Sequence, residues 1–533
     1  MSSSSETPES TAKNSDDEQK AGRKQGLLRS SGIVSLMTML SRVLGLVRDV
    51  TFANLFGAGS GADAFFVAFK IPNFFRRLFA EGAFNQAFVP ILTEYKTKKD
   101  HLAVKMLIAN TAGSLAVILS AVTLLVVFAS SYVVYIFAPG FASLPAKMTL
   151  AGDMLQITFP YLLLVSLTAF SGSVLNSYGR FAVPAFTPVI LNIVLIACAF
   201  LLSPLFERPI MALAWGVLLA GGVQLLFQYP FLKQLDFTPM PRWGWNTEGV
   251  VRIRTLMIPA LFGVSVGQIN LLLDTILASF LEDGSVSWLY YSDRLMELPL
   301  GVFGIAIATV ILPSLSTKHA EKSTGSFSET LDWAVRMVLF IGLPSALALG
   351  VLAEPLLVTL FQYGEFGAGD VDKAALSLRA YAAGLLGFML IKVLAPGYFA
   401  RQDTKTPVKV GITAMVANMV FNLILIVPLA HAGLALATSM AAFLNAGLLL
   451  AGLVRSGVFQ FHRGWGRFGL QLALGNSALL VVLLVLNQPL EQWLAWGVMS
   501  RVSWVALIVV SGIVAYFVAL GVGGMRPRHL KHI

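Results

Sequence analysis

Long apolar stretches recur along almost the whole of this 533-residue chain, and they constrain its fold more than any other feature. A hydrocarbon layer about 30 Å thick is crossed by about 20 helical residues, whose backbone polar groups are all paired within the helix. Hydrophobic residues make up 56% of the chain and charged residues 12%, a balance more apolar than soluble domains show. The sequence therefore predicts an all-α, polytopic membrane protein.

The apolar stretches divide into 14 predicted membrane-spanning helices. The first six cover residues 31–54, 62–92, 105–136, 150–179, 183–204 and 210–232. The next six cover 250–280, 286–315, 330–362, 374–400, 406–429 and 432–454, and the last two cover 467–488 and 496–523. The predicted parts are a disordered tail (1–27), an amino-terminal lobe (28–235), a carboxyl-terminal lobe (248–458), a final helix pair (464–524) and a second tail (525–533).

The basic residues of the loops predict the orientation of the chain. Cytoplasmic loops are enriched in Lys and Arg, and alternate loops here are basic. With the amino terminus inside, the opposite side holds only Lys147, Arg208, Lys373 and Arg379. The tail also lacks the apolar core and cleavage site of a signal peptide. We therefore expect both termini in the cytoplasm and, because the spans are helices rather than barrel strands, the inner membrane of a bacterium.

Charge and cysteine content exclude several classes of function. The net charge of +10 is dispersed among apolar spans instead of forming one soluble basic domain, which argues against nucleic-acid binding. Cys198 is the single cysteine, so disulfides within the chain and cysteine-based metal sites are excluded. The chain also has no Walker A sequence to indicate a nucleotide-driven pump.

Ionisable residues interrupt the first two spans. The first span holds Arg42, Arg48 and Asp49, and the second region holds Asp63, Lys70, Arg76, Arg77 and Glu81. Such groups cost about 2.5–3.5 kcal/mol each on insertion scales, and they usually face a wet cavity or a charged ligand. The surplus of arginine predicts an anionic ligand, since guanidinium presents a planar fork of donors to phosphate oxygens. Interior ion pairs and arginines that reach lipid headgroups are the alternative.

Helical spacing indicates that these arginines do not all face one way. Arg42 and Arg48 differ by about 240° around a helix. Arg76 and its neighbour also diverge, so we expect one to face a cavity and the other to be held by Glu81 or a lipid headgroup. Arg294 follows Asp293 and precedes Glu297 by three residues, so local neutralisation is an alternative to ligand binding there.

Two pairs of matching segments indicate an internal repeat. Pro90 and Pro313 lie 223 residues apart, and Thr187 and Thr406 lie 219 residues apart, each in a similar local sequence. Six spans fit this separation. The repeat predicts two six-helix lobes around a central cavity that opens alternately to either face, plus two carboxyl-terminal helices.

Four long strings resemble one known family closely. They are SRVLGLVRD (41–49), FGAGSGADAFFVAFKIPNFFRRLFAEGAFNQAFVPIL (56–92), YYSDRLMELPLGVFG (290–304) and KVLAPGYFARQDTKTPVK (392–409). These strings resemble the MurJ (MviN) family of lipid II flippases, within the multidrug/oligosaccharidyl-lipid/polysaccharide exporter superfamily. The resemblance implies a transporter, not an enzyme, whose substrate is undecaprenyl-diphosphate carrying the disaccharide-pentapeptide precursor of peptidoglycan.

The resemblance also implies roles for individual residues. Arg42, Arg48, Arg76 and Arg294 match cationic cavity positions, and Asp63 and Glu81 match acidic positions. Ser41, Asp49 and Arg77 lie in the same motifs and complete the candidate substrate-binding set. The expected mechanism is alternating access driven by the membrane potential, with the polyprenyl tail in a groove along the last two helices. Expected partners are lipid II, membrane lipids and the cell-wall synthesis machinery, and the expected state is a monomer.

A second group of polar residues forms a candidate sodium site. Asp274 lies in the seventh span, Asn418 and Asn422 share a face of the eleventh, and Thr438 lies in the twelfth. Their hard oxygen atoms suit a small cation, and some family members look similar in carrying sodium there. Hydrogen bonding between helices, worth about 0.6 kcal/mol on average, is the preferred interpretation of these residues. No other cofactor is expected.

Three rival functions remain open at this point. A glycosyltransferase using the same polyprenyl donor would need catalytic carboxylates, and only the short acidic loop 363–373 offers any. A cation-coupled exporter of drugs or another polyprenyl-linked glycan should carry acidic rather than arginine-rich cavity helices. A scaffold without transport would leave the arginines of the spans unexplained.

Overall fold

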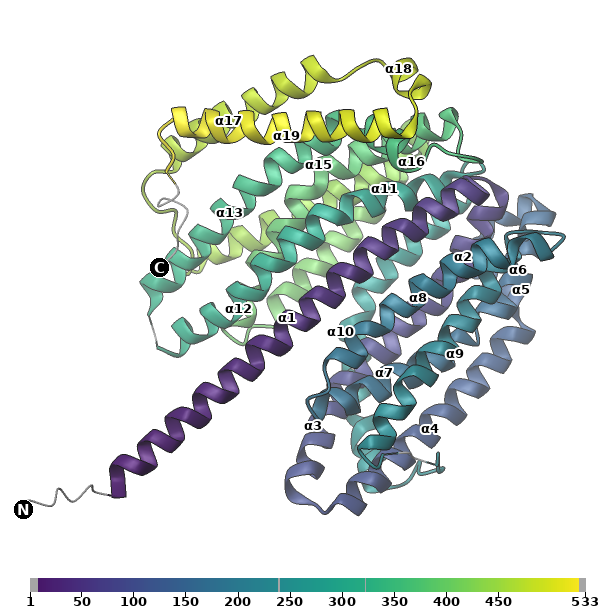
Figure 1. Cartoon of the computed structure of the whole chain (residues 1–533), viewed down its shortest axis with the longest axis vertical. Coiled ribbons are helices and arrows are strands. Elements are labelled where there is room, and N and C mark those ends of the chain that lie inside the picture. The colour runs from purple at the N-terminus through teal and green to yellow at the C-terminus, as the bar shows by residue number, and fades with distance from the viewer. Residues whose placement is uncertain (1–7, 238–239, 322, 527–533) are drawn as a thin grey trace, which may run out of the picture. The chain divides into compact units, whose positions relative to one another are not determined.

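The computed structural model describes residues 8–237, 240–321 and 323–526, and within these ranges it contains helices and no strand (Figure 1). The helices before residue 280 are α1 (Pro8–Phe56), α2 (Ser60–Phe75), η1 (Arg76–Ala83), α3 (Phe84–Lys98), α4 (His101–Phe128), α5 (Ser130–Phe137), η2 (Pro139–Ser143), α6 (Pro145–Thr158), α7 (Tyr161–Ser177), α8 (Ala182–Leu201), η3 (Ser203–Leu205), α9 (Met211–Gln234) and α10 (Glu248–Ser279). Those that follow are α11 (Ser285–Pro299), η4 (Leu300–Gly304), α12 (Ile305–Ala320), α13 (Thr324–Val351), α14 (Ala353–Leu360), α15 (Ala368–Phe399), α16 (Lys405–Arg455), α17 (Trp465–Leu486), α18 (Leu490–Ala495) and α19 (Val498–Val522). The predicted all-α class is confirmed.

Nine helical segments of the described residues are long and apolar enough to cross a membrane. One of them, α16, covers both of the spans predicted at 406–429 and 432–454, and Ala430 interrupts it with non-helical angles (φ 47°, ψ −128°). A left-handed φ at a non-glycine residue marks a sharp turn, so α16 is two helices joined at that position. The number 14 stays a prediction.

The second span of each predicted lobe has the same interruption. In the amino-terminal half the π-helical segment η1 separates α2 from α3, and in the carboxyl-terminal half η4 separates α11 from α12. Pro90 lies in α3 and Pro313 in α12, so the two matching prolines occupy corresponding helices. This correspondence supports the internal repeat inferred from the sequence.

The amino-terminal tail differs from the prediction. Residues 8–27, predicted to be disordered, form the first part of α1. This stretch contains Glu18, Gln19, Lys20 and Ala21, which are strong helix formers, and the helix continues without a break into the first span. Low hydrophobicity predicts that a segment cannot fold alone, but it does not prevent a membrane helix from extending into it. Residues 1–7 and 527–533 lie outside the described part.

The chain packs as two compact units. Unit 1 contains residues 1–48, 75–128 and 157–261, and unit 2 contains residues 49–74, 129–156 and 262–533. These units do not follow the predicted lobes, because two segments of the amino-terminal half, 49–74 and 129–156, pack with the carboxyl-terminal half. The lobes therefore stay a prediction about sequence repeats, whereas the units describe which segments are packed together.

Each unit has its own buried core. In unit 1 an aromatic group joins α3 to α7: the Phe88 ring lies 5.2 Å from Phe84 and 5.0 Å from Phe170, measured between centroids. In unit 2 α15 packs closely along α16, where a Cβ on Gly384 would collide with the Ser439 hydroxyl oxygen. Small residues allow such close approach between membrane helices, whose association depends on packing and polar contacts.

Candidate functional site

The predicted substrate-binding residues divide between the two units. Unit 1 carries Ser41, Arg42, Arg48, Arg76 and Arg77, and unit 2 carries Asp49, Asp63 and Arg294. The Glu81 side chain lies outside the part of the chain that the structure describes. Within each unit these residues differ in the groups that surround them.

Arg48 is held by an amide that the sequence reading did not single out. Its side chain is 7% exposed and donates a hydrogen bond of 3.0 Å to the side-chain oxygen of Asn192 on α8. Asn192 in turn donates through its amide nitrogen to the backbone carbonyl of Ser41, at 2.9 Å. An asparagine within an otherwise apolar span was the only signal for this role. Ser41 takes part through its backbone, not through its hydroxyl.

The other predicted substrate-binding arginines of unit 1 are more accessible to solvent than Arg48. Arg42 on α1 is half-buried, and no carboxylate of the described residues forms an ion pair with it. Arg76 is half-buried and Arg77 is exposed, so the two neighbours meet different environments, as their spacing predicts. Both lie in η1, and π-helical turns within a longer helix recur at functional sites because they change the direction of the following side chains.

Arg294 of α11 has carboxylate partners within unit 2. Its guanidinium lies 2.8 Å from Glu297 and 3.7 Å from Asp49, and it stacks over the Tyr290 ring at 4.8 Å. Tyr290 donates its hydroxyl to Asp49 at 2.9 Å, and its ring stacks on Phe66 with centroids 3.9 Å apart. The pairing with Glu297 is the local neutralisation that the spacing suggested.

The Asp63 carboxylate accepts hydrogen bonds from several protein donors. It is 1% exposed and accepts hydrogen bonds from the backbone N–H groups of Gly284 and Ser287, both at 2.8 Å, and from the Ser287 hydroxyl at 2.6 Å. These donors form the amino terminus of α11, where unpaired N–H groups favour a carboxylate. Gly284 reaches this position with φ 96°, a conformation that favours glycine.

Lys147 completes this arrangement, although the sequence reading treated it only as a loop cation. Its ammonium lies 2.7 Å from Asp63 and 2.5 Å from Asp283, with its side chain 4% exposed. Ser60 donates a second hydrogen bond, of 2.5 Å, to Asp283. Burial raises the pKa of the Asp283 carboxyl, but the hydrogen bonds from Lys147 and Ser60, together with the positive charge of Lys147, lower it by more, so this pKa lies below its ordinary value. We refer to Asp63, Lys147 and Asp283 as the outer ion cluster.

The four residues of the candidate sodium site do come together. Asp274 accepts hydrogen bonds from the amide nitrogens of Asn422 at 2.8 Å and Asn418 at 3.3 Å, and from the Thr438 hydroxyl at 3.5 Å. Asn270, which the sequence reading missed, accepts from Asn418 at 2.8 Å. Among the described residues no cluster of three or more His, Cys, Asp or Glu side chains is placed to bind a metal.

One feature of this polar group fits a monovalent cation. The side-chain oxygens of Asn418 and Asn422 are buried, and neither has a hydrogen-bond partner. Rotating both amides by 180° would turn these oxygens toward the carboxylate, an arrangement that a cation between them would stabilise. Lys70 of α2 is exposed and lies within electrostatic range of Asp274.

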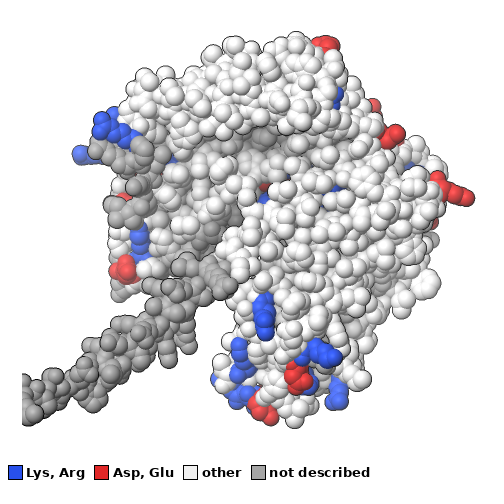
Figure 2. Space-filling view, viewed as in Figure 1, with Lys and Arg blue, Asp and Glu red and all other residues white. Residues whose placement is uncertain are grey.

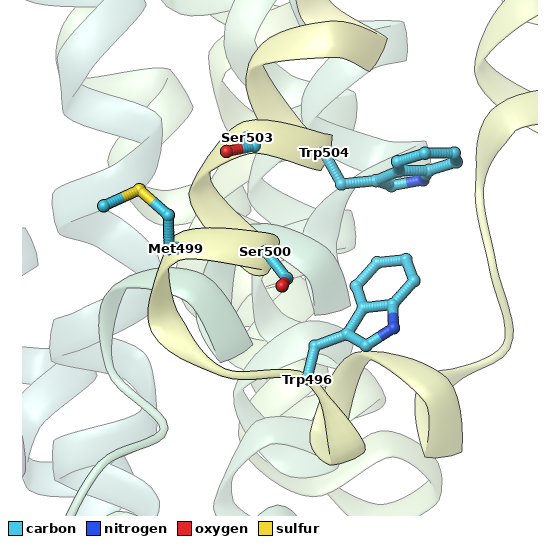
Figure 3. A pocket seen from close by; sticks show the side chains of 5 residues that line it. All are labelled: Trp496, Met499, Ser500, Ser503 and Trp504. Atoms are coloured by element: carbon cyan, nitrogen blue, oxygen red, sulfur yellow. The ribbon is translucent and has the colours of Figure 1, made fainter.

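A separate pocket lies at the start of α19 (Figure 3). Its volume is about 380 Å³, and it is lined by Trp496, Met499, Ser500, Ser503 and Trp504. In the close-up the two indole rings lie on the same side of the helix, and their centroids are 5.6 Å apart. The lining contains no cation, so this pocket does not suit a diphosphate group.

Charged residues gather at one end of the helices of unit 1. Figure 2 shows helix flanks that are almost free of charge and a group of Lys and Arg at the end where α3 meets α4. That end carries Lys98 and Lys105, which pair with Glu94 at 3.6 Å and Asp236 at 3.0 Å. Apolar flanks with basic ends are typical of helices that cross a membrane.

Comparisons with known proteins agree with the sequence motifs. Residues 52–507 match the profile of the family described as "Lipid II flippase MurJ". A Vibrio cholerae protein named "Probable lipid II flippase MurJ" is 52% identical over 95% of this chain and 98% of its own length. The "Lipid II flippase MurJ" of Burkholderia cenocepacia is 42% identical, over 95% and 99% of the two chains.

Solved structures show the same fold. A structure described as "Lipid II flippase MurJ, inward closed conformation" covers 92% of this chain and 98% of its own, with a TM-score of 0.77 and 27% identity. A multidrug resistance MATE family transporter of the MOP superfamily shares the fold alone, with a TM-score of 0.63 at 13% identity. The profile covers most of the chain and the relatives match it nearly end to end. The chain belongs to the MurJ family of lipid II flippases.

Proposed function

We propose that this flippase moves lipid II from the inner to the outer leaflet by alternating access, and that Arg42, Arg48 and Arg76 bind its diphosphate. The observation that carries this proposal is the state of Arg42, a guanidinium within a membrane span that no described carboxylate neutralises. A cation in that position is stabilised by an anionic ligand or by water. Arg48, oriented by the neutral amide of Asn192, supplies a second donor group.

Arg294 has a different part in this proposal. Its charge is shared with Glu297 and Asp49, so it binds the diphosphate only when one of these ion pairs loosens. Asp49 and Asp63 order protein groups instead of contacting the substrate directly. Arg77, which is exposed, is proposed to meet lipid headgroups or the substrate at the entrance.

The last two helices suit the polyprenyl tail. α17 packs along α19, and apolar side chains of both remain exposed: Leu470, Val481, Leu484 and Val485 on α17, and Val510, Val514, Phe517 and Val518 on α19. We propose that the tail stays in the lipid phase along this pair while the headgroup crosses. Only the charged headgroup then has to leave the membrane–water boundary.

The membrane potential is the proposed driving force. Outward movement of negative charge is favoured by an inside-negative potential, by about 2.3 kcal/mol per charge per 100 mV. Sodium bound at Asp274, Asn418, Asn422 and Thr438 is a proposed coupling ion, and the two unpaired amide oxygens support it. Dissipating the potential in cells is expected to stop export, and unchanged export would overturn the voltage proposal.

The proposed setting is the bacterial inner membrane with both termini in the cytoplasm, since the basic loops alternate along the chain. We propose that the protein works as a monomer beside the cell-wall synthesis machinery. The enzyme and scaffold readings both lose support, because the family consists of flippases. An exporter of drugs or another glycan is likewise not favoured, since the relatives matched nearly end to end carry the lipid II flippase name.

The test is the leaflet distribution of lipid II. After depletion of the native protein, a membrane-impermeant enzyme that cleaves lipid II reports the outward-facing pool. Wild-type protein is expected to restore cleavage, whereas Arg42→Ala and Arg76→Ala, expressed at equal levels, are not. The matched control is Arg379→Ala, which removes a surface cation paired with Glu354 at 2.6 Å. An unchanged outward pool after depletion would overturn the flippase function.

A further inference from the structure

The short loop between α10 and α11 carries two neighbouring carboxylates, and each forms an ion pair with a different half of the chain. Glu282 pairs with Lys373 of α15 at 2.7 Å, so its partner belongs to the carboxyl-terminal half of the chain. Asp283 pairs with Lys147 of α6 and accepts from Ser60 of α2, both of the amino-terminal half. All of these residues lie in unit 2. One loop is therefore tied to both halves through adjacent residues.

Lys147 is placed where the two halves meet in unit 2. Its ammonium is buried between Asp63, from its own half, and Asp283, from the other. It also lies 4.3 Å from the centre of the Phe141 ring, which closes one side. A buried lysine with two carboxylate partners is favourable only while both remain in place, because separation leaves a poorly solvated charge on each side.

Asp63 adds a second tie across the same junction. Its oxygens accept from Gly284 and Ser287 of the carboxyl-terminal half while Lys147 holds it from the amino-terminal half. Separation of the halves would break the bonds to α11 and to Asp283 but would leave the Asp63–Lys147 pair intact. When the halves separate, Asp63 and Lys147 would therefore stay with the amino-terminal half, and Asp283 would stay with the carboxyl-terminal half.

We propose that the outer ion cluster is a latch on the extracytoplasmic side, in which the Lys147–Asp283 pair holds the gate closed until the transporter turns outward. This inference rests on the alternating-access function proposed above. The loops involved are those that the positive-inside pattern places outside. When the latch opens, water replaces the protein partners of the buried charges. The strength of the Lys147–Asp283 pair therefore sets the equilibrium between the closed and open states.

The experiment measures the gate directly, with no substrate present. Cys198 is the single cysteine, so Cys198→Ala supplies a clean background for two spin labels in the full chain in lipid nanodiscs. Thr149→Cys on α6 and Ala368→Cys on α15 are both exposed and lie on the two halves. Electron–electron double resonance then gives the distribution of distances between them.

The expected result distinguishes the effect of Asp283 from that of its neighbour Glu282. Asp283→Asn and Lys147→Met are each expected to raise the ratio of long to short distances at least about tenfold, whereas Lys147→Arg retains the short distance. Glu282→Gln and Lys373→Met remove an ion pair on the same face within one half, and they should leave the distribution unchanged. Should Lys147→Met fail to fold, Asp283→Asn with its Glu282→Gln control decides the matter.

Two outcomes would overturn the latch: an unchanged distribution in Asp283→Asn, or an equal shift in Glu282→Gln. The failure of the proposed function is distinguishable, because it appears in the lipid II cleavage assay and not in the distances. A shift in distances with no lipid II export by the wild-type protein would retain the latch and reject the transport proposal.

Discussion

Arg48 and Asn192, 144 residues apart in the chain, form a buried hydrogen bond of 3.0 Å between α1 and α8. The amide accepts from the guanidinium without cancelling its charge, and its own nitrogen is used on the Ser41 carbonyl. Asn192 therefore fixes the direction of the Arg48 guanidinium. A carboxylate of the same size would still accept from Arg48 but would place a negative charge beside it, and it could not donate to the Ser41 carbonyl.

The Asn192→Asp variant is therefore expected to export poorly, and to lose some stability because a carboxylate cannot donate the hydrogen bond that the Asn192 amide makes to the Ser41 carbonyl. The new carboxylate pairs with Arg48 and weakens its attraction for diphosphate, since opposite charges in contact stabilise each other at the expense of a third. Asn192→Leu, by contrast, removes an acceptor from a charged donor and should lower stability by about 1.5–3 kcal/mol. Thermal unfolding and the lipid II cleavage assay separate the two effects. Full export by Asn192→Asp would contradict the proposed role of Arg48.

Arg42→Gln is expected to reduce lipid II affinity by about 10- to 100-fold, the range for one charge-assisted hydrogen bond. Its effect on unfolding should be small, because no described carboxylate depends on it. Equilibrium binding of lipid II to the purified protein in nanodiscs measures the change. Arg379→Gln is the control, since its guanidinium is bound to Glu354 on the surface. Equal losses in both variants would indicate a nonspecific effect of charge.

Periodicity and charge were enough to predict the helical class and most span positions, and the resemblance to the flippase family added the group around Asp274. Asn418 and Asn422 are four residues apart on one helix, so their shared face follows from helical geometry alone. Asp274 carries the one carboxylate among the four predicted residues, and hydrogen-bonding side chains gather around such a group. The shared face of the two asparagines depends on local spacing, whereas the meeting of the three helices was implied by the family resemblance.

The hydrogen-bond partners of Asp63 could not be predicted from the sequence. The second-span motif marks it as charged, but its donors lie more than 200 residues later, on Gly284 and Ser287. Backbone N–H groups have no signature in the sequence. Lys147 was equally hidden, because a single lysine in a predicted outer loop resembles an ordinary exposed residue until its burial is known. Contacts of this kind depend on tertiary packing rather than on spacing.

Sodium is expected to stabilise the wild-type protein and not the Asp274→Asn variant. A ligand that binds only the folded state at 100 times its dissociation constant adds about 2.7 kcal/mol. Thermal unfolding in sodium chloride and in choline chloride, at equal ionic strength, measures this increment. Asn476→Ala is a matched control, because its buried amide bonds only to the Leu472 carbonyl of its own helix. An identical melting temperature in both salts would leave the Asp274 group as hydrogen bonding between helices.

Arg501→Met is expected to loosen the attachment of α19 to α14. The Arg501 side chain is 5% exposed and donates to four backbone carbonyls, those of Val358, Gln362, Trp493 and Leu494, at 3.0 to 3.2 Å. These oxygens lie near helix ends, where carbonyls have no partner within the helix. Methionine fills a similar volume but leaves the carbonyls unpaired, so unfolding should become easier by about 3 kcal/mol. Arg501→Lys, which keeps the charge but has fewer donors, should recover only part of this loss, and thermal unfolding of the three proteins measures the order. A melting temperature of Arg501→Met equal to that of the wild type would show that these hydrogen bonds do not hold the last helix pair in place.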